Sequence, residues 1–458
     1  MPVVNPQIFR EYDVRGLVGK DLSRETVDLI GRAYGTYIRR RGLTDVVVGR
    51  DNRLSSRAYR DTIVEALLET GCNVMDIGLV VTPIFYFTRA RYGIEGGVMI
   101  TGSHNPPEFN GFKLGKGVAT MYGEEIQDLR RLVESGRFEK GRGSLSMLDP
   151  VSEYIETIRN GIKLGPRKVT VVVDCGNGAG GLFGPRALEA IGCDVIPLFC
   201  EPDGNFPNHF PDPVKPENLA HLVEAVRKHG ADVGVAYDGD ADRLGAVDEN
   251  GNHLWGDILM VLFWREIIPR HPGADALVEV KCSQALVDEI RRLGGNPIFS
   301  KTGHSLIKAK MKEIGAIFTG EMSGHMFFAD EYYGFDDAIY ASARLMRIIS
   351  HSDKSISEML GDIPRYYSTP ETRVDCPDDV KFRVVKEMTE HFRSRYDVIE
   401  VDGARVLFPK GWGLVRASNT QPALVLRAEA TDPESLEDIK AQMQGKLSQY
   451  PEVGEIDW

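Results

Sequence analysis

A strand-like apolar run that leads into a loop and then a helix recurs three times in the chain. GGVMI, at residues 96–100, precedes the loop TGSHNPPEFNG, and KVTVVVD, at residues 168–174, precedes CGNGAGG. The third run begins at residue 274 and leads into a helix that Ser283 can cap. This alternation is typical of α/β domains, which bind ligands in the loops after strand ends. The spacing predicts three similar α/β units of about a hundred residues or more each.

The last part of the chain differs from these repeats. After residue 366, a helical pattern is followed by VIEVDGARVLFP, GWGLVRASNTQPALVLRAEA and a final amphipathic helix, which predicts a smaller α+β domain with an antiparallel sheet. We therefore expect four domains, at residues 1–150, 151–253, 254–365 and 366–458. A length of 458 residues also exceeds what one hydrophobic core usually serves.

Five prolines interrupt the second unit within residues 201–219. They exclude regular structure until Leu219 begins a helix face. The segment is therefore either an ordered loop or lid, or merely a connection.

Charge and cysteine usage limit the possible partners. The chain has 55 Lys and Arg against 67 Asp and Glu, a net charge of -12, so we expect no nucleic-acid or membrane partner. Six scattered cysteines without a CxxC pair favour buried thiols in a reducing cytosol over disulfides or zinc ligands. The charged start MPVVNPQIFREYDVRG does not resemble a signal peptide, and no apolar run reaches the roughly 18 residues of a membrane helix. We expect a cytoplasmic protein.

The strongest chemical signal is the acidic loop within residues 233–251. Asp238, Asp240 and Asp242 alternate after an apolar run, and three converging carboxylates suit a hard divalent cation such as Mg²⁺. A calcium-binding EF-hand would use Glu249 as its last ligand, but Arg243 stands where that loop needs glycine. A solvated acidic turn is the other alternative. Arg243 argues against it, because a cation beside carboxylates is most useful where an anion is also held.

Ser103 lies in the turn-rich loop TGSHNPPEFNGFK, directly after a strand. Its hydroxyl is expected to be exposed on a tight turn. The chain has no GxSxG elbow at this loop to suggest acyl transfer. Phosphoryl transfer is more natural, because a seryl phosphate could be neutralised there by a metal and by cations. Taken alone, such a loop is more often structural.

Two further loops carry polar groups that suit a sugar phosphate. In GEMSGH, the alternate positions of Glu321, Ser323 and His325 point to one side of an extended chain, where a carboxylate and a hydroxyl can bind vicinal sugar hydroxyls. The loop RASNT supplies a guanidinium, two hydroxyls and an amide for a phosphate, from Arg416, Ser418, Asn419 and Thr420. An ordinary polar turn is the alternative for each loop.

These four loops, in this order and at these separations, resemble the α-D-phosphohexomutase family, and most closely its bacterial phosphomannomutase/phosphoglucomutase branch. The resemblance covers essentially the whole chain, including the segments IFREYDVRG and GNFPNHFPDP. It implies an α/β protein of four domains around a central cleft. Three of them would be similar α/β domains with mixed sheets, and the fourth a smaller C-terminal α+β domain.

The resemblance also implies roles for individual residues. It makes Ser103 the phosphoserine and, with Asp238, Asp240 and Asp242, a ligand of one Mg²⁺ per chain. It implies sugar-hydroxyl binding by Glu321 and Ser323, and binding of the substrate phosphate by the RASNT residues. The remaining catalytic residues would be Arg15, His104, Lys113 and His325, and the remaining substrate-binding residues Tyr12, Arg243, Lys281 and His304.

The implied reaction is a two-step phosphoryl exchange between phospho-Ser103 and a hexose 1- or 6-phosphate. It passes through a bound hexose 1,6-bisphosphate, which would also serve as the activator. Lys113 or His325 is the acid or base, and Lys113 suits the role if nearby cations lower its pKa. Turning the sugar around exchanges the positions of O3 and O4, so the same residues can bind it in both orientations. The C2 hydroxyl has no dedicated partner, and glucose and mannose differ only there, so both are expected as substrates.

Alternative functions remain at this point. A phosphoglucosamine mutase would carry a GEQSGH-like loop in place of GEMSGH. A metal-dependent sugar-phosphate phosphatase would lose the seryl phosphate to water. A non-catalytic sugar-phosphate binder would be expected to have lost Ser103 or an aspartate, and all four are present. We expect small sugar phosphates as the ligands and a monomer or weak dimer.

Overall fold

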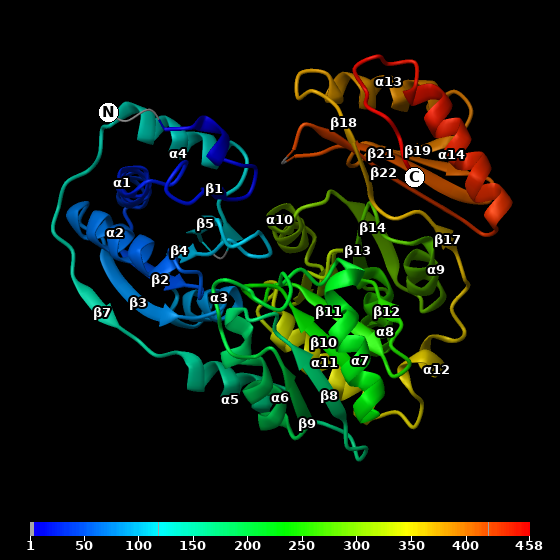
Figure 1. Cartoon of the computed structure of the whole chain (residues 1–458), viewed down its shortest axis with the longest axis horizontal. Helices are drawn as coiled ribbons and strands as arrows, with labels where there is room; N and C mark the ends of the chain where they lie inside the picture. Colours follow the sequence, from blue (N-terminus) through cyan, green and yellow to red (C-terminus); the bar gives the residue numbers. More distant parts are fainter. Residues whose placement is uncertain (1–3, 118, 420) are drawn as a thin grey trace. The chain divides into compact units, whose positions relative to one another are not determined.

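A computed structural model describes residues 4–117, 119–419 and 421–458 (Figure 1). The chain forms two compact units. The first comprises the described residues up to Phe263 together with Ser323–Gly361, and the second comprises Trp264–Met322 and Asp362–Trp458. The segment predicted as a third domain therefore contributes to both units. Among the described residues, no helix has the length and apolar character needed to cross a bilayer.

The first sheet of the first unit is mixed and has the strand order β1-β5-β4-β2-β3-β7, with β6 paired to β5. Its strands are β1 (Val14–Leu17), β2 (Asp45–Arg50), β3 (Asn73–Leu79), β4 (Gly96–Ile100), β5 (Phe109–Lys116), β6 (Ala119–Thr120) and β7 (Leu145–Met147). Strands β2, β3, β4 and β7 are parallel, whereas β5 runs antiparallel to both β4 and β1. The predicted strand at residues 96–100 is confirmed, and the loop after it lies at the end of a central strand.

Four helices accompany this sheet: α1 (Arg24–Arg40), α2 (Ser56–Glu69), α3 (Thr82–Tyr92) and α4 (Glu124–Ser135). The predicted cap of the first is confirmed, because the Ser23 side chain accepts a hydrogen bond from the backbone N–H of Thr26. Apolar side chains of α1, α2 and α4, including Ile30, Ile63 and Leu129, form one buried core with the strands. This core fixes the strand ends that carry the loops.

The second sheet of the first unit has the order β12-β11-β10-β8-β9. Its strands are β8 (Thr170–Asp174), β9 (Asp194–Leu198), β10 (Val233–Tyr237), β11 (Leu244–Asp248) and β12 (His253–Leu254). Strand β8 lies parallel to both β9 and β10, and β10 and β11 form an antiparallel hairpin. The acidic loop is the turn of this hairpin. Its helices are α5 (Val151–Gly161), α6 (Gly184–Ile191), α7 (Ala220–His229), α11 (Ala338–Ser350) and α12 (Ile356–Leu360). A short 3-10 helix, η2 (Ala179–Leu182), lies between β8 and α6, and another, η1 (Pro6–Ile8), precedes β1.

The proline-rich segment is an ordered loop whose middle packs beneath the acidic hairpin. Pro211 and Pro213 are buried, and a side chain added at Gly239 or Gly245 of the hairpin would contact them. Regular structure returns slightly earlier than predicted. A short 3-10 helix, η3 (Pro216–Leu219), precedes α7, because proline is compatible with the first turn of a helix.

The second unit contains an α/β part and an antiparallel part. Parallel strands β13 (Asp275–Glu279) and β14 (Asn296–Ser300) accompany α9 (Gln284–Arg292), which Ser283 caps as predicted, and α10 (His304–Ile314). The C-terminal sheet has the order β17-β22-β21-β20-β19, with β18 paired to β22, and all its pairs are antiparallel. Its elements are β17 (Tyr367–Ser368), β18 (Thr372–Asp375), α13 (Lys381–Arg393), β19 (Asp397–Ile399), β20 (Ala404–Phe408), β21 (Gly411–Ala417), β22 (Ala423–Ala430) and α14 (Pro433–Leu447). The predicted α+β domain is confirmed (Figure 1).

Four elements lie near the points where the chain passes between the units: α8 (Gly256–Ile267), η4 (Ile268–Arg270), β15 (Phe318–Gly320) and β16 (Met326–Phe328).

Within the second unit, Val384 of α13 and Met443 of α14 belong to one buried core with Leu424 of β22. This core supports the strand end that leads into the RASNT loop.

Candidate active site

Ser103 follows β4 in a strained and buried turn. Its backbone φ is +48°, in the left-handed region that a non-glycine residue rarely adopts, and its backbone N–H donates to Thr101 Oγ1 at 2.8 Å. The predicted exposure of the hydroxyl is wrong, since Ser103 is only 3% exposed. The hydroxyl is buried because the loop after β4 packs against the loop after β10, where Ser103 Oγ donates to Asp238 Oδ2 at 2.7 Å. Strained backbone of this kind concentrates at functional sites.

Arg53 holds the Ser103 loop in place through backbone carbonyls. Its guanidinium donates to the carbonyl oxygens of Ser103 at 2.7 Å, Asn105 at 2.5 Å, Pro106 at 2.7 Å and Phe109 at 2.9 Å. Asp51 Oδ2 lies 3.3 Å from its Nε and balances its charge. Arg53 was not predicted from the sequence, because nothing in GRDNR indicates that the partners of its second arginine are main-chain oxygens.

We expect Arg53→Lys to reduce kcat by about ten- to a hundredfold and to destabilise the fold by about 3 kcal/mol. A lysine ammonium is a point donor that cannot reach four carbonyls arranged as a fork, so the loop would lose its fixed position. Steady-state kinetics and thermal unfolding measure the two effects. Arg57→Lys, at an exposed arginine of α2, is the matched control. Wild-type kcat in the Arg53 variant would show that the loop does not need this anchor.

The three predicted aspartates converge in the hairpin turn between β10 and β11. Asp238, Asp240 and Asp242 are buried, and one carboxylate oxygen from each lies within 4.8 Å of the others. A side chain at Gly239 would approach the Ser103 carbonyl oxygen to 2.4 Å, so only glycine allows the two loops to meet there. Strands flank the turn, as expected, and Glu249 instead pairs with Ser357, so an EF-hand is excluded.

Lys113 of β5 sits against the carboxylates. Its Nζ donates to Asp240 Oδ2 at 2.8 Å and also to Asp242 Oδ2, and Thr82 Oγ1 donates to Asp240 at 2.5 Å. Burial alone lowers the pKa of Lys113, but Asp240 and Asp242 outweigh it and raise the pKa well above its usual value. The suggestion that nearby cations lower this pKa is therefore wrong for this structure, because two carboxylates are its nearest charges.

The carboxylates themselves divide by their surroundings. Burial, together with Asp242 and Asp240, raises the pKa of Asp238 well above its usual value. Burial also opposes ionisation of Asp240, but Lys113 and the hydrogen bonds from Lys113 and Thr82 leave the pKa of Asp240 lowered. The Oδ1 atoms of Asp240 and Asp242 are buried, and neither accepts a hydrogen bond from any residue that the structure describes. Buried, unsatisfied carboxylate oxygens are expected ligands of a hard cation, so this set fits Mg²⁺.

Cationic and imidazole groups surround the serine and the carboxylates. Arg243 donates its backbone N–H to Asp238 Oδ1 at 3.1 Å and its Nε to His325 Nε2 at 3.1 Å. His325 Nδ1 lies 3.0 Å from Asp336 Oδ2. Thr82 and Asp336 were not predicted from the sequence. Thr82 is 158 residues from Asp240, and no motif marks Asp336 as the partner of His325.

His104 and Arg15 complete this part of the site. His104 Nδ1 lies 3.1 Å from Ser103 Oγ, and burial with the charges of Arg243 and Arg15 lowers the pKa of His104 well below its usual value. Arg15 donates to Asn105 Oδ1 at 2.5 Å, beside Ser103 in the chain. The structure thus brings together Arg15, Ser103, His104, Lys113, Asp238, Asp240, Asp242, Arg243 and His325 in the first unit, which also contains Tyr12 and Ser323.

The second unit gathers several predicted substrate residues around a buried carboxylate. Glu279, at the end of β13, is fully buried and accepts hydrogen bonds from Thr302 Oγ1 at 2.5 Å and from the backbone N–H groups of Lys281 and Met322 at 3.3 and 3.4 Å. Glu321 accepts from the backbone N–H of Gly303 at 2.8 Å, which precedes His304. Glu279 therefore connects the loops that carry Lys281, His304 and Glu321, although nothing in its sequence context marks it.

Arg416 belongs to the same group in the second unit. Its Nε donates to Asp402 Oδ2 at 2.9 Å, which also accepts from the backbone N–H of Thr302 at 3.0 Å. Ser418 is buried and its Oγ accepts from the backbone N–H of Gln421, whereas Asn419 is exposed. Thr420, the last member of the predicted phosphate loop, lies outside the described residues.

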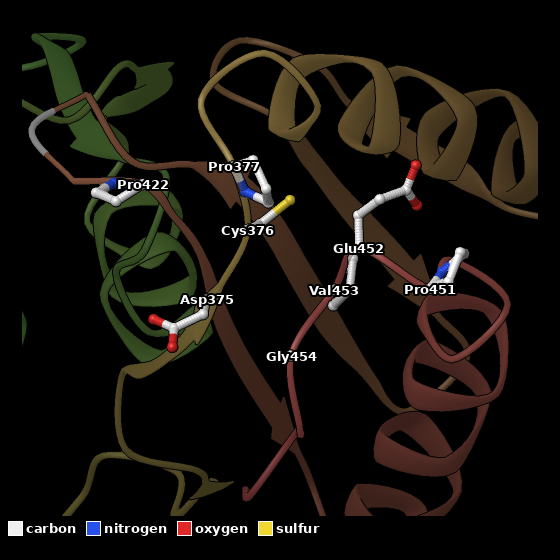
Figure 2. Close-up of a pocket in the computed structure, with 8 residues that line it drawn as sticks. All are labelled: Asp375, Cys376, Pro377, Pro422, Pro451, Glu452, Val453 and Gly454. Atoms are coloured by element: carbon white, nitrogen blue, oxygen red, sulfur yellow. The ribbon is translucent and has the colours of Figure 1, made fainter.

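A separate open groove of about 540 Å³ lies beside the C-terminal segment of the second unit (Figure 2). It is lined by Asp375, Cys376, Pro377, Pro422, Pro451, Glu452, Val453 and Gly454. Three of the eight lining residues are prolines, and none of the predicted site residues belongs to the lining. The groove is therefore distinct from the candidate active site.

The site combines a buried serine hydroxyl with three carboxylates that fit a divalent cation and with adjacent lysine and arginine side chains. This combination is typical of metal-dependent phosphoryl-transfer enzymes.

Four family models match the chain in succession. They are described as phosphoglucomutase/phosphomannomutase alpha/beta/alpha domain I (residues 6–140), domain II (152–251), domain III (255–367) and C-terminal domain (371–446). The chain belongs to the phosphoglucomutase/phosphomannomutase family. The resemblance found in the sequence is confirmed, and so is the expected fold class of three α/β domains followed by a smaller C-terminal α+β domain.

Individual relatives agree with this assignment. A phosphomannomutase/phosphoglucomutase of Pseudomonas aeruginosa is 45% identical over 447 residues, covering 97% of this chain and 96% of the relative. A phosphoglucomutase of Neisseria gonorrhoeae is 42% identical over 458 residues, covering 99% of each. The crystal structure of a phosphoglucomutase/phosphomannomutase family protein from Burkholderia thailandensis has a TM-score of 0.92 at 40% identity, covering 98% of each chain.

Proposed function

We propose that this chain is a phosphohexomutase that interconverts the 1- and 6-phosphates of glucose and mannose through phospho-Ser103 and a bound hexose 1,6-bisphosphate. The observation that carries the proposal is the 2.7 Å hydrogen bond from Ser103 Oγ to Asp238 Oδ2, inside the buried carboxylate group. A phosphate on this oxygen would lie at a cation site and beside Lys113 and Arg243. The names of the relatives support hexose phosphates as the substrates.

We propose that Ser103, Asp238, Asp240 and Asp242 together hold one Mg²⁺. When bound, the ion would neutralise the charge that develops on the phosphoryl group during transfer. The residues of the chain do the positioning. Arg53 fixes the serine loop through its carbonyls, and Arg243 bridges the aspartate loop to His325.

We propose different proton roles for Lys113 and His325. The ammonium of Lys113 donates to two carboxylates, so it keeps its proton and acts as a fixed cation. His325 Nε2 accepts a hydrogen bond from Arg243, so this nitrogen is unprotonated. It would take the proton of the attacking sugar hydroxyl once that hydroxyl replaces Arg243 as its hydrogen-bond partner. His104 stays neutral beside Ser103, because burial and neighbouring cations lower its pKa.

The proposed substrate contacts follow the sequence motifs. Glu321 and Ser323 would bind the sugar hydroxyls O3 and O4 in both orientations, and the C2 hydroxyl would be left without a dedicated partner. Arg416 and the other RASNT residues would hold the phosphate that is not being transferred. Tyr12, Arg15, Lys281 and His304 would complete substrate binding.

The remaining features of the proposal come from the sequence. We propose domain boundaries at residues 150, 253 and 365, activation by the hexose 1,6-bisphosphate, a cytoplasmic location, and a monomer or weak dimer. Small sugar phosphates would be its partners, without nucleic acid or membrane partners.

The decisive experiment incubates the protein with glucose 1-phosphate, Mg²⁺ and a trace of glucose 1,6-bisphosphate. Glucose 6-phosphate is expected as the main product, whereas a predominance of free phosphate would identify a phosphatase instead. Comparison of kcat/KM for the 1-phosphates of mannose, glucose and glucosamine then defines the sugar. We expect mannose and glucose to be used with similar efficiency, and a preference for glucosamine would contradict the proposal.

A further inference from the structure

Two cysteine side chains that are not among the candidate active-site residues lie in contact. The Sγ atoms of Cys175 and Cys200 are 3.3 Å apart, although both cysteines are free thiols. Their proximity follows from the topology, because β8 and β9 are parallel neighbours with Asp174 opposite Leu198, and each cysteine comes just after its strand. The carboxyl ends of two paired strands therefore place the two thiols next to each other.

The two thiols differ in accessibility and in chemistry. Cys175 is fully buried, whereas Cys200 is partly exposed. The hydrogen bond with Cys175 lowers the pKa of Cys200, whereas burial raises the pKa of Cys175. An accessible, more acidic thiol beside a buried one is the arrangement of an attacking and a resolving cysteine. The sequence favoured buried thiols over disulfides, because residues 175 and 200 show no CxxC spacing.

We propose that Cys200 and Cys175 form a reversible disulfide when the protein meets hydrogen peroxide. The Cys200 thiolate attacks one peroxide oxygen and breaks the O–O bond, which gives a sulfenic acid and, after protonation, water. The Cys175 sulfur then attacks Cys200 Sγ, the S–O bond breaks, and the Cys175 proton leaves with the hydroxide as a second water. Two thiols are oxidised and one peroxide is reduced to two waters.

The disulfide would act on the cation site through one short loop. The Cys175 carbonyl accepts from the backbone N–H of Gly178 at 2.7 Å, and the N–H of Ala179 donates to the carbonyl of Gly239 at 3.2 Å. Gly239 lies between the aspartates of the hairpin turn. Closing the sulfur atoms from 3.3 Å to the roughly 2.05 Å of a disulfide shifts the start of this loop. We therefore expect oxidation to lower mutase activity about two- to tenfold, and a thiol reductant to restore it.

The test treats the full chain with a slight excess of hydrogen peroxide, alkylates remaining thiols and measures intact mass, peptide linkage and activity. We expect two alkylation sites to be lost, with a mass about 2 Da lower before alkylation and a link between the Cys175 and Cys200 peptides. Dithiothreitol should reverse the change. Cys200→Ser and Cys175→Ser should each prevent it, and Cys193→Ser, at the opposite end of β9, should not.

Other results would overturn the inference. Oxidation that stops at about 16 or 32 Da of added oxygen, or a link through Cys193, would exclude the Cys175–Cys200 disulfide. A disulfide that forms without any change of activity would exclude its coupling to Gly239. The mass and linkage readouts do not depend on the proposed mutase function, so failure of one proposal is distinguishable from failure of the other.

Discussion

Replacement of Ser103 by alanine is expected to lower mutase kcat by about four to six orders of magnitude, the loss seen when an essential nucleophile is removed. Ser103 Oγ is the hydroxyl that donates to Asp238 Oδ2 at 2.7 Å. Without this oxygen, a phosphoryl group cannot be carried on the enzyme between the two half-reactions. The measurement is the rate of glucose 6-phosphate formation from glucose 1-phosphate with the bisphosphate present, together with intact mass.

The matched control for this substitution is Ser146→Ala, at an exposed serine on β7 of the same sheet. It should retain wild-type kinetics. The melting temperature of Ser103→Ala should fall by no more than a few degrees, because alanine fits the space of serine and only the hydrogen bond to Asp238 is lost. A Ser103→Ala protein that keeps more than about a hundredth of the activity, or that still carries a covalent phosphate, would contradict the role of this serine.

The strand-to-loop transitions were predictable from the sequence. GGVMI followed by TGSHNPPEFNG changes from an apolar run to turn-forming residues, and the structure ends β4 at Ile100 as predicted. The alternation of Asp238, Asp240 and Asp242 likewise indicated that three carboxylates meet. In both cases the information lies within a few neighbouring residues.

The contacts between loops were not predictable in the same way. Ser103 and Asp238 are separated by 135 residues, and Thr82 and Asp240 by 158. The packing of sheets and helices determines which of these distant residues meet. No spacing rule predicts such pairs from a single sequence. Long-range contacts of this kind bury the Ser103 hydroxyl and raise the pKa of Lys113. The expectations of an exposed hydroxyl and of a lowered Lys113 pKa were wrong for this reason.

The charge balance of the aspartate cluster explains why a divalent cation fits it. Three ionised carboxylates with the Lys113 ammonium leave two negative charges in a buried space, which one divalent cation neutralises. Mutual repulsion and burial disfavour ionisation, as the raised pKa of Asp238 indicates. Cation binding removes this cost, so Mg²⁺ is expected to raise the melting temperature as well as to support activity.

Asp240→Asn is expected to weaken Mg²⁺ binding by about a hundredfold and to lower kcat by a factor of about 10² to 10³ at a fixed Mg²⁺ concentration. The change removes one negative charge and one buried oxygen ligand, while an amide of the same shape keeps the packing and can still accept from Thr82. Calorimetric titration with Mg²⁺ and activity as a function of Mg²⁺ after chelation measure the effect. Glu249→Gln, on the same hairpin but paired with Ser357, is the control and should leave Mg²⁺ affinity unchanged. Equal Mg²⁺ affinity in Asp240→Asn and wild type would place the cation elsewhere.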